Sequence, residues 1–368
     1  MTKKRFKKMG VGLLAVTLTA LAVGQGWMND WLQFGKKAAL LSVGLQQPDS
    51  GAVALSERVD KAAAKAAPKP VTPSEPSTST TPPTVASPTL SVTKPTSPLA
   101  PGTAPKKAAN AGTVLEQLVS TGSEFTQGVA VKNRSGKVFD LTKELKQKPS
   151  LSLEKNKKEP QVLIVHTHTT EGYLTYDAGF YNPADVERTR DQSRNVCAAG
   201  AAIVTALKAA GISAVQDTTI HDSPQYTGAY SRSEQTVKAA LKKYPSVKVV
   251  LDIHRDAIHP SDTTRVKPTA TVNGKKAAQM MIIAGVVSTD SLPHKNWQQN
   301  FHFALQLQKN LAGHYPDLMR PLYLVASRYN QHLSPGYLLV EIGTDVNTAE
   351  EAVYSGSLLG KTLAETLL

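Results

Sequence analysis

Short apolar stretches and longer amphipathic stretches alternate from residue 160 to the C-terminus. The apolar stretches predict buried strands at 162–165, 247–253, 279–287, 321–326 and 337–342. Apolar residues spaced three and four apart predict helices at 192–210, 231–244, 297–312 and 348–366. Such alternation predicts an α/β domain over residues 160–368, with a mainly parallel or mixed sheet and helices on both faces.

The segment before this domain has a weaker pattern. Residues 111–159 predict a short helix at 114–119, then a hairpin of strands 128–131 and 137–141. We interpret this segment as a small N-terminal extension that packs on the main domain. Within the main domain, Ser231 and Glu234 have the spacing of a capping box, which predicts that the second helix begins there.

The N-terminus combines a basic start with an apolar run. Five Lys or Arg residues lie between positions 3 and 8, and residues 9–28 carry no charge. This order is typical of an export signal, and a run of about 20 apolar residues can span a bilayer. We predict a cytoplasmic stub and an uncleaved anchor over residues 1–30, with a cleaved signal peptide as the alternative. The chain is then a single-pass protein of the cell membrane whose domain is extracytoplasmic.

Residues 31–110 form a low-complexity spacer rich in Pro, Ser, Thr and Ala. Residues 61–110 alone hold 11 of the 23 prolines. Such a composition buries too little apolar surface to offset its ordering entropy, so we expect an extended linker between membrane and domain.

The basic charge of the chain resides in this N-terminal part. Of the net +13, the residues before Pro160 contribute 23 Lys/Arg against 11 Asp/Glu, and the rest 19 against 18. A basic linker attracted to anionic lipid or wall polymers explains this distribution, and no nucleic-acid partner is expected. The single cysteine, Cys197, excludes an intrachain disulfide and lies on the apolar side of a predicted helix, which indicates a buried side chain.

Candidate chemistry collects where three predicted strands end. His166, His168 and Glu171 follow the first strand, Asp252, His254 and Asp256 end a central one, and Glu341 ends the last. Sites of α/β sheets form at the carboxyl ends of strands, and two histidines with one carboxylate are a hydrolytic zinc donor set.

The spacing assigns roles within this group. His168 and Glu171 are close enough in sequence to share a metal, and His254 supplies the second nitrogen. Glu341 is the candidate general base, and Asp252 and Asp256 are candidates for orienting a ligand histidine. His166 competes with His168 for the first ligand position. The remaining histidines are expected at the surface or in local caps: His221, His259, His294, His302, His314 and His332.

These segments resemble a known family. Residues 160–173, 252–257, 329–331 and 340–344, in that order, are similar to the motifs of stage II sporulation protein P. The resemblance covers about residues 128–368, and the signal anchor with its spacer matches the family's layout. It implies a fold similar to those of zinc amidases and metallocarboxypeptidases, with one Zn²⁺ held by His168, Glu171 and His254 and with Glu341 as the base.

The same resemblance implies an activity and partners. The implied reaction is cleavage of the peptidoglycan amide between N-acetylmuramic acid and L-alanine, and also of stem-peptide cross-links. The implied process is septal wall thinning and forespore engulfment during sporulation. The implied partners are a sporulation membrane protein and a lytic transglycosylase of the same complex. The related amidases take their acidic ligand from the start of the next helix, which makes Asp191 a rival to Glu171.

Four residues are candidates for substrate binding. Arg255 and Arg328 carry guanidinium groups that match a stem-peptide carboxylate. Asn330 and Gln331 carry amides able to bind glycan or peptide. Two alternative functions stay open: a metallocarboxypeptidase that trims stem peptides, and a non-catalytic scaffold that binds the wall.

Overall fold

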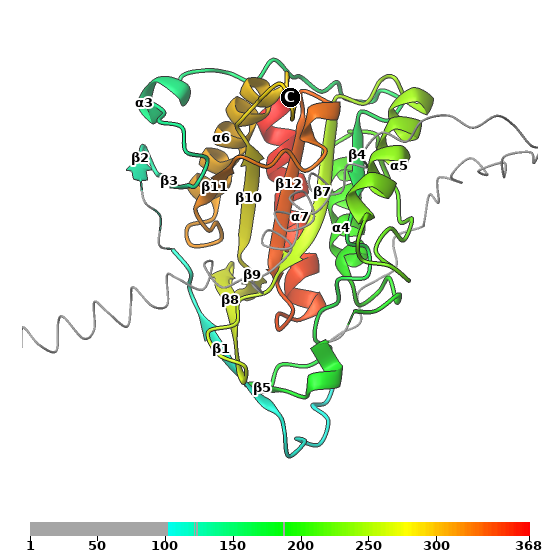
Figure 1. Cartoon of the computed structure of the whole chain (residues 1–368), viewed down its shortest axis with the longest axis vertical. Helices are drawn as coiled ribbons and strands as arrows, with labels where there is room; N and C mark the ends of the chain where they lie inside the picture. Colours follow the sequence, from blue (N-terminus) through cyan, green and yellow to red (C-terminus); the bar gives the residue numbers. More distant parts are fainter. Residues whose placement is uncertain (1–101, 121, 123, 187) are drawn as a thin grey trace, which may run out of the picture. The chain divides into compact units, whose positions relative to one another are not determined.

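The computed structural model describes residues 102–120, 122, 124–186 and 188–368 (Figure 1). The predicted anchor at 1–30 and nearly all of the predicted spacer at 31–110 lie outside these residues. Among the described residues, no helix combines the length and apolar character needed to cross a membrane.

The main sheet has eight strands and mixed direction. In spatial order they are β2 (Glu124–Thr126), β3 (Val129–Asn133), β11 (Leu322–Val325), β10 (Met280–Gly285), β12 (Tyr337–Thr344), β7 (Val249–Asp256), β4 (Val162–Val165) and β6 (Ala214–Gln216). Strands β12, β7, β4 and β6 are parallel to one another, whereas β10 runs antiparallel to β12 and parallel to β11. The structure confirms an α/β fold with a mixed sheet, and all five predicted strands are present.

Helices cover both faces of this sheet, as predicted. On one face α4 (Val196–Ala209), α6 (Trp297–His314) and α7 (Ala349–Leu367) bury the even-numbered side chains of β4 and the odd-numbered ones of β7. On the other face α5 (Ala229–Lys243) packs on Leu163, Val165 and Val250. All eight residues of β7 are buried, since the strand is covered on both sides.

A second, four-stranded sheet joins segments far apart in the sequence. Its order is β5 (Phe180–Tyr181), β1 (Gly112–Gln117), β8 (Thr264–Val272) and β9 (Lys275–Ala278). The short helices are α3 (Leu141–Glu144), η1 (Pro183–Val186) and η2 (Gln331–Leu333). Strand β1 of this sheet and strand β3 of the main sheet both come from the segment before residue 160.

Three local predictions were wrong, two in that segment and one at the start of α5. The residues expected as a helix at 114–119 form β1, which pairs with β8 over five residues. The hairpin forms between β2 and β3 instead, with its turn at Gln127 and Gly128, which both have a positive φ. Helix α5 begins at Ala229, after Gly228 in the left-handed region, so Ser231 lies inside its first turn and does not cap it.

Candidate metal centre

The three polar clusters meet because β4, β7 and β12 are adjacent and parallel. In the pairing register, Val165 lies opposite Asp252, and His254 lies opposite Glu341. The carboxyl ends of these strands therefore lie at one edge, and the residues that follow β4 turn back over the ends of the other two. The exposed fractions of His168, Glu171, His254 and Glu341 are 2%, 1%, 0% and 1%.

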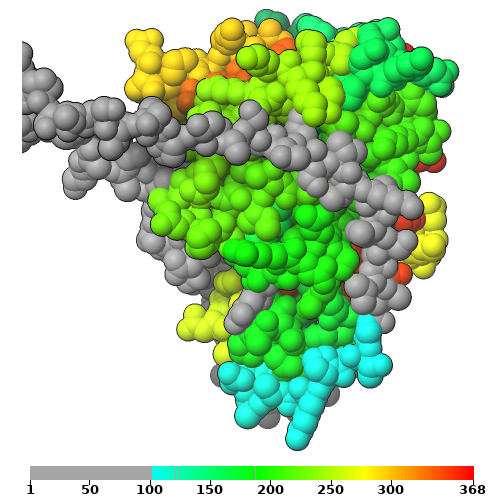
Figure 2. Space-filling view, turned by 90° about the vertical axis from the view of Figure 1, so that its right-hand side faces the viewer, coloured from blue at the N-terminus to red at the C-terminus, as the bar shows by residue number. Residues whose placement is uncertain are grey.

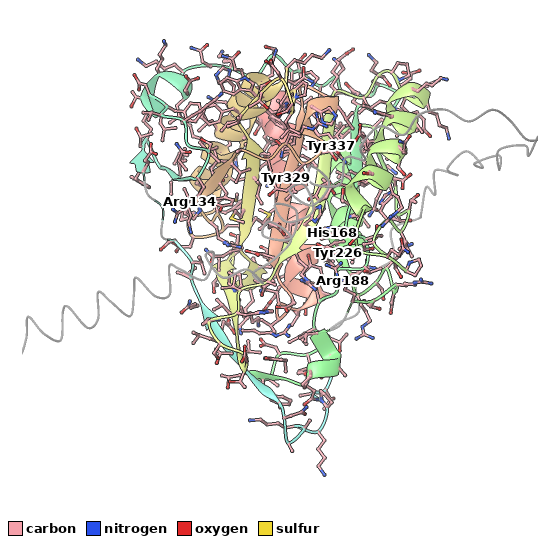
Figure 3. All side chains as sticks on the ribbon, viewed as in Figure 1. Arg134, His168, Arg188, Tyr226, Tyr329 and Tyr337 are labelled. Atoms are coloured by element: carbon pink, nitrogen blue, oxygen red, sulfur yellow. The ribbon has the colours of Figure 1, made fainter. Side chains whose placement is uncertain are left out.

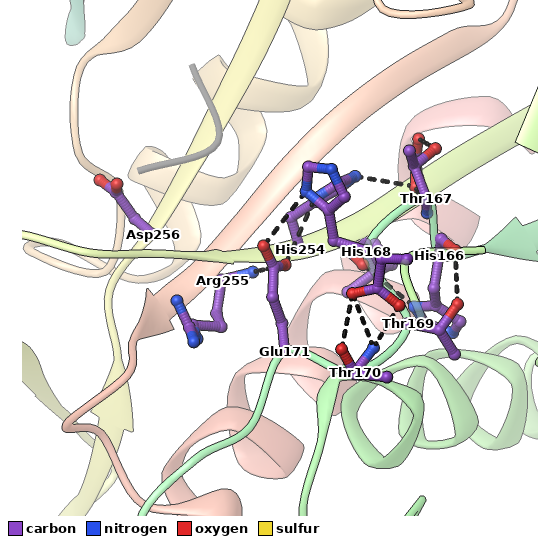
Figure 4. Close-up of polar contacts among 12 residues, drawn as sticks. His166, Thr167, His168, Thr169, Thr170, Glu171, His254, Arg255 and Asp256 are labelled. Atoms are coloured by element: carbon purple, nitrogen blue, oxygen red, sulfur yellow. Dashed lines mark hydrogen bonds and ion pairs between the residues drawn. The ribbon is translucent and has the colours of Figure 1, made fainter. Parts of the chain in front are cut away.

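His168, Glu171 and His254 form a compact, buried cluster (Figure 4). A turn brings the first two together, because the Glu171 amide donates to the His168 carbonyl at 3.1 Å. The Glu171 carboxylate then lies between the two imidazoles. Its Oε1 is 3.3 Å from His168 Nδ1, and its Oε2 is 3.3 Å from His254 Nδ1.

This cluster fits a zinc ion in both donor type and spacing. Zinc bonds to nitrogen and oxygen are about 2.0–2.1 Å long, so ligand atoms around a tetrahedral ion are roughly 3.3 Å apart. One ligand atom from each residue lies within 4.8 Å of the other two, and each histidine Nδ1 is 3.3 Å from one of the two Glu171 oxygens. His254 Nδ1 has no hydrogen-bond partner within the described part of the chain, so this buried nitrogen is available to bind a metal.

Asp252 supports His254 from the side opposite Glu171. Its Oδ1 lies 3.0 Å from His254 Nε2, and its two oxygens accept from the Thr167 amide at 2.8 Å and hydroxyl at 2.6 Å. Burial alone would raise the pKa of Asp252, but His254 and Thr167 outweigh it and hold that pKa well below the usual range. Burial likewise opposes charge on His254, yet Asp252 and Glu171 raise the pKa of its ring well above the ordinary value.

Glu341 lies beside this cluster, and no hydrogen bond or ion pair among the described residues compensates the burial of its carboxyl group. Both of its carboxylate oxygens are buried, and neither has a hydrogen-bond partner among the described residues. Burial, and next the charge of Asp256, raise the pKa of Glu341 to about 8. A carboxyl group with such a pKa exchanges a proton near neutrality, which is the requirement for general acid–base chemistry.

An aromatic and cationic layer covers the cluster. Tyr226 stacks on the His168 ring with centroids 4.5 Å apart, and its hydroxyl is 3.3 Å from His168 Nδ1. The Arg188 guanidinium lies 4.7 Å from the centroid of the Tyr226 ring and reaches Asp222 at 2.5 Å and Glu171 at 3.5 Å. Figure 3 shows His168, Tyr226 and Arg188 next to one another. Tyr226 lies in the segment just before α5. Figure 2 shows that segments coloured green form much of the surface on the face it presents.

The two rival ligands lie outside the cluster. His166 Nδ1 donates to the Ile253 carbonyl at 3.0 Å, and its Nε2 accepts from Gln216 at 2.9 Å. Burial lowers the pKa of His166 to about 4, so the ring is neutral and both nitrogens are used. Asp191 is exposed, and its carboxylate accepts from the amide and hydroxyl of Ser193.

The other two charged candidates on β7 make internal contacts. The Arg255 side chain is buried, its Nε donates to the Gly172 carbonyl at 3.1 Å, and its backbone amide donates to Glu171 Oε2 at 3.1 Å. Arg255 thereby fixes the turn that presents Glu171. Asp256 is paired with the buried Arg320 at 2.9 Å and does not contact His254.

The remaining substrate candidates also have structural partners. Arg328 donates to the Pro293 carbonyl at 3.0 Å. The Asn330 amide donates to the Tyr230 carbonyl at 3.0 Å, and Gln331 exchanges two hydrogen bonds with the backbone of β10 at its end. These amides hold the loop before β12 against α5 and the sheet.

Two of the histidines expected at the surface are buried. His221 bridges the His166 carbonyl at 2.8 Å and the Thr236 hydroxyl at 2.9 Å, and His294 is fully enclosed. No local sequence pattern indicated that Thr167, Arg188 or Tyr226 contributes to the site, because their partners come from distant segments.

Comparisons with known proteins place the chain in a family. A family model described as Stage II sporulation protein P matches residues 91–364. Stage II sporulation protein P of Bacillus subtilis (strain 168) is 29% identical over 258 residues, which are 64% of this chain and 61% of that protein. The chain therefore matches only about three fifths of that relative's length.

Solved structures give a weaker likeness. The N-acetylmuramyl-L-alanine amidase Ami1 of Mycobacterium smegmatis has 12% identity and a TM-score of 0.33, over 58% of this chain and 99% of that chain. The CwlD amidase of Clostridioides difficile, in complex with the GerS lipoprotein, has 11% identity and a TM-score of 0.30, over 56% of this chain and 95% of that chain. TM-scores this low do not establish a shared fold or a shared activity. The family model, however, matches most of the sequence, and the chain belongs to the stage II sporulation protein P family.

Proposed function

We propose that the chain is a zinc-dependent peptidoglycan hydrolase that cleaves the amide between N-acetylmuramic acid and L-alanine of the stem peptide. The observation that carries this proposal is the buried cluster of His168, Glu171 and His254 beside the unpaired carboxyl group of Glu341. A buried carboxyl without a partner is costly to keep, and next to a metal donor set it has the placement of a general base.

The residues divide the chemistry between them. Zn²⁺ held by His168, Glu171 and His254 supplies Lewis acidity that polarises a carbonyl group and acidifies water. Glu341 accepts the proton of the attacking water and passes it to the leaving nitrogen as the amide bond breaks. Asp252 holds the imidazole of His254 in place through its contact with Nε2.

The setting of this activity is proposed from family membership and from the N-terminal sequence. The proposal includes cleavage of stem-peptide cross-links and a role in wall thinning during engulfment, with the membrane protein and the transglycosylase as partners. It also includes attachment to the membrane through residues 1–30, with the spacer carrying the domain into the wall.

Product analysis tests the reaction. The purified chain, loaded with one equivalent of Zn²⁺, is incubated with peptidoglycan, and the products are identified by mass spectrometry. Release of intact stem peptides is the expected result. Release of single terminal amino acids would indicate a carboxypeptidase instead.

Matched variants test the site. His168→Ala and Glu341→Gln should each abolish release, and only the first should also lose zinc. The controls are His314→Ala and Glu159→Gln, two exposed positions away from the cluster, which should keep full activity. If His168→Ala lost zinc but kept the cellular function of the protein, a non-catalytic scaffold would be the better description.

A further inference from the structure

A second tyrosine near the metal cluster has a hydroxyl that the fold does not satisfy. The Tyr230 hydroxyl oxygen is buried and has no hydrogen-bond partner among the described residues. A buried donor left unpaired costs about 1–3 kcal/mol, and in native structures such a group calls for an explanation.

The ring of Tyr230 lies against both ligand histidines. It stacks on His254 with centroids 6.5 Å apart and an interplanar angle of 11°, and it meets His168 edge-on at 5.5 Å. It also packs on the sheet face that bears Leu339. Side chains two residues apart on a strand share a face, so Glu341 lies on this same face, one pleat further along β12.

The backbone of Tyr230 is held firmly. The residue is the second of α5, and its carbonyl accepts from the Asn330 amide at 3.0 Å and from the Ser233 hydroxyl at 3.2 Å. Tyr329 packs on the ring with centroids 5.6 Å apart. The position of the unpaired hydroxyl is therefore set by rigid elements, as a group that acts on a substrate requires.

The neighbouring tyrosines differ from Tyr230 in this respect. The Tyr226 hydroxyl is engaged with His168, and the Tyr337 hydroxyl donates to Asp252 at 3.4 Å. Both have partners in the folded chain. Of these three tyrosines, Tyr230 is the one whose hydroxyl has no partner among the described residues. The two carboxylate oxygens of Glu341 also lack one.

We propose that Tyr230 is a catalytic residue whose hydroxyl donates a hydrogen bond to the substrate's carbonyl oxygen while negative charge develops on that oxygen. The proposal rests on the hydrolase function proposed above. In the step concerned, the water oxygen bonds to the carbonyl carbon, and the carbonyl π electrons move to the oxygen that Tyr230 contacts. Glu341 takes the water proton. The electron pair on the oxygen then re-forms the C=O bond as the C–N bond breaks, and Glu341 gives the proton to the leaving nitrogen. Tyr230 keeps its own proton throughout, because a phenol is a neutral donor at neutral pH.

The test compares Tyr230→Phe with Tyr354→Phe in the full chain. The Tyr354 hydroxyl, on α7, donates to the Val272 carbonyl at 3.1 Å and has a structural role only. Four quantities are measured: bound zinc, the melting temperature of the metal-free chain, and kcat and KM on soluble muramyl-peptide fragments.

Tyr230→Phe should bind zinc like the wild type and keep or raise its melting temperature, since the substitution removes the cost of a buried, unpaired hydroxyl. Its kcat should fall by about 10²-fold, the effect of losing one such donor, while KM changes little. Tyr354→Phe should lose about 2–4 °C in melting temperature and retain its kcat.

Two results would overturn the assignment. One is a kcat of Tyr230→Phe equal to that of the wild type. The other is a loss of kcat that comes with loss of zinc or of melting temperature, which would make the hydroxyl structural. If the zinc-loaded wild type released no stem peptides, the hydrolase function itself would have failed. The catalytic role of Tyr230 would fail with it. A wild type that releases stem peptides, together with a Tyr230→Phe variant of equal kcat, would overturn the role of the hydroxyl alone.

Discussion

Replacing Asp252 by Asn should weaken zinc binding without unfolding the domain. The amide is isosteric with the carboxylate, so it still accepts one hydrogen bond from Thr167. It lacks the negative charge that faces His254 Nε2 at 3.0 Å, and that charge fixes the ring and makes Nδ1 a better donor.

The magnitude follows from the position of Asp252. Loss of a hydrogen-bonded partner of a ligand histidine lowers metal affinity by about 10–100-fold, or roughly 1.4–2.7 kcal/mol. The upper half of this range is expected, because Asp252 is completely buried and water cannot replace it. The assay is competition for Zn²⁺ with a chromophoric chelator at pH 7.

Asp256→Asn is the matched control for this prediction. Asp256 lies on the same strand, two residues to the other side of His254, and is equally buried, but its partner is Arg320. Its loss should cost about 3–5 kcal/mol of folding stability, because Arg320 is left buried without its partner, and it should leave zinc affinity unchanged. Equal zinc affinity of Asp252→Asn and the wild type would refute the reasoning, and so would an equal loss in both variants.

Three further predictions concern stability and reactivity. The pKa of Glu341 is raised from 4.5 to about 8, so the folded metal-free chain holds a proton that the unfolded chain releases between these pH values. Stability should therefore fall from pH 5 to pH 8 in urea unfolding, and fall less in Glu341→Gln. Gly356→Ala should lower the free energy of unfolding by about 1–3 kcal/mol, because a Cβ at this position would lie 2.5 Å from the Ala199 carbonyl oxygen. A Cβ at Gly313 would contact nothing within 4 Å, so Gly313→Ala should leave the free energy of unfolding unchanged or raise it in the same assay. Cys197 is buried and its thiol pKa is raised by burial, so it should react with a thiol reagent in urea but not in the native chain.

The fold of the main domain was predictable because its pattern is set by local burial. Strands β4 and β7 are covered on both faces, and this requires unbroken apolar runs that are visible in the sequence. The clustering of His168, Glu171 and His254 was predictable because the carboxyl ends of parallel strands lie at the same edge of a sheet. This prediction did not require the pairing register of the strands.

The errors arose where a distant partner decides the structure. Strand β1 has few buried residues and owes its conformation to β8, which lies far along the chain. Asn330 remains a candidate for substrate binding, and its amide also donates to the Tyr230 carbonyl of α5, a contact that the sequence does not reveal. An amide or guanidinium side chain looks the same in sequence whether its partner is a ligand or the backbone, so spacing alone cannot assign its role.

The buried acids at the site edge of the sheet show which residue the fold leaves for chemistry. Five of them lie at or just after the carboxyl ends of β4, β7 and β12. Four of these five have a cationic partner or a histidine partner among the described residues, and one has none: Glu171, Asp252, Asp256, Asp345 and, unpartnered, Glu341. Burying a carboxyl group without a partner is among the largest local penalties that a fold can carry. A sheet that compensates four neighbouring carboxylates has the means to compensate a fifth, and an apolar residue at this position would remove the penalty. The penalty at Glu341 is therefore best explained by a reaction that uses its free oxygens.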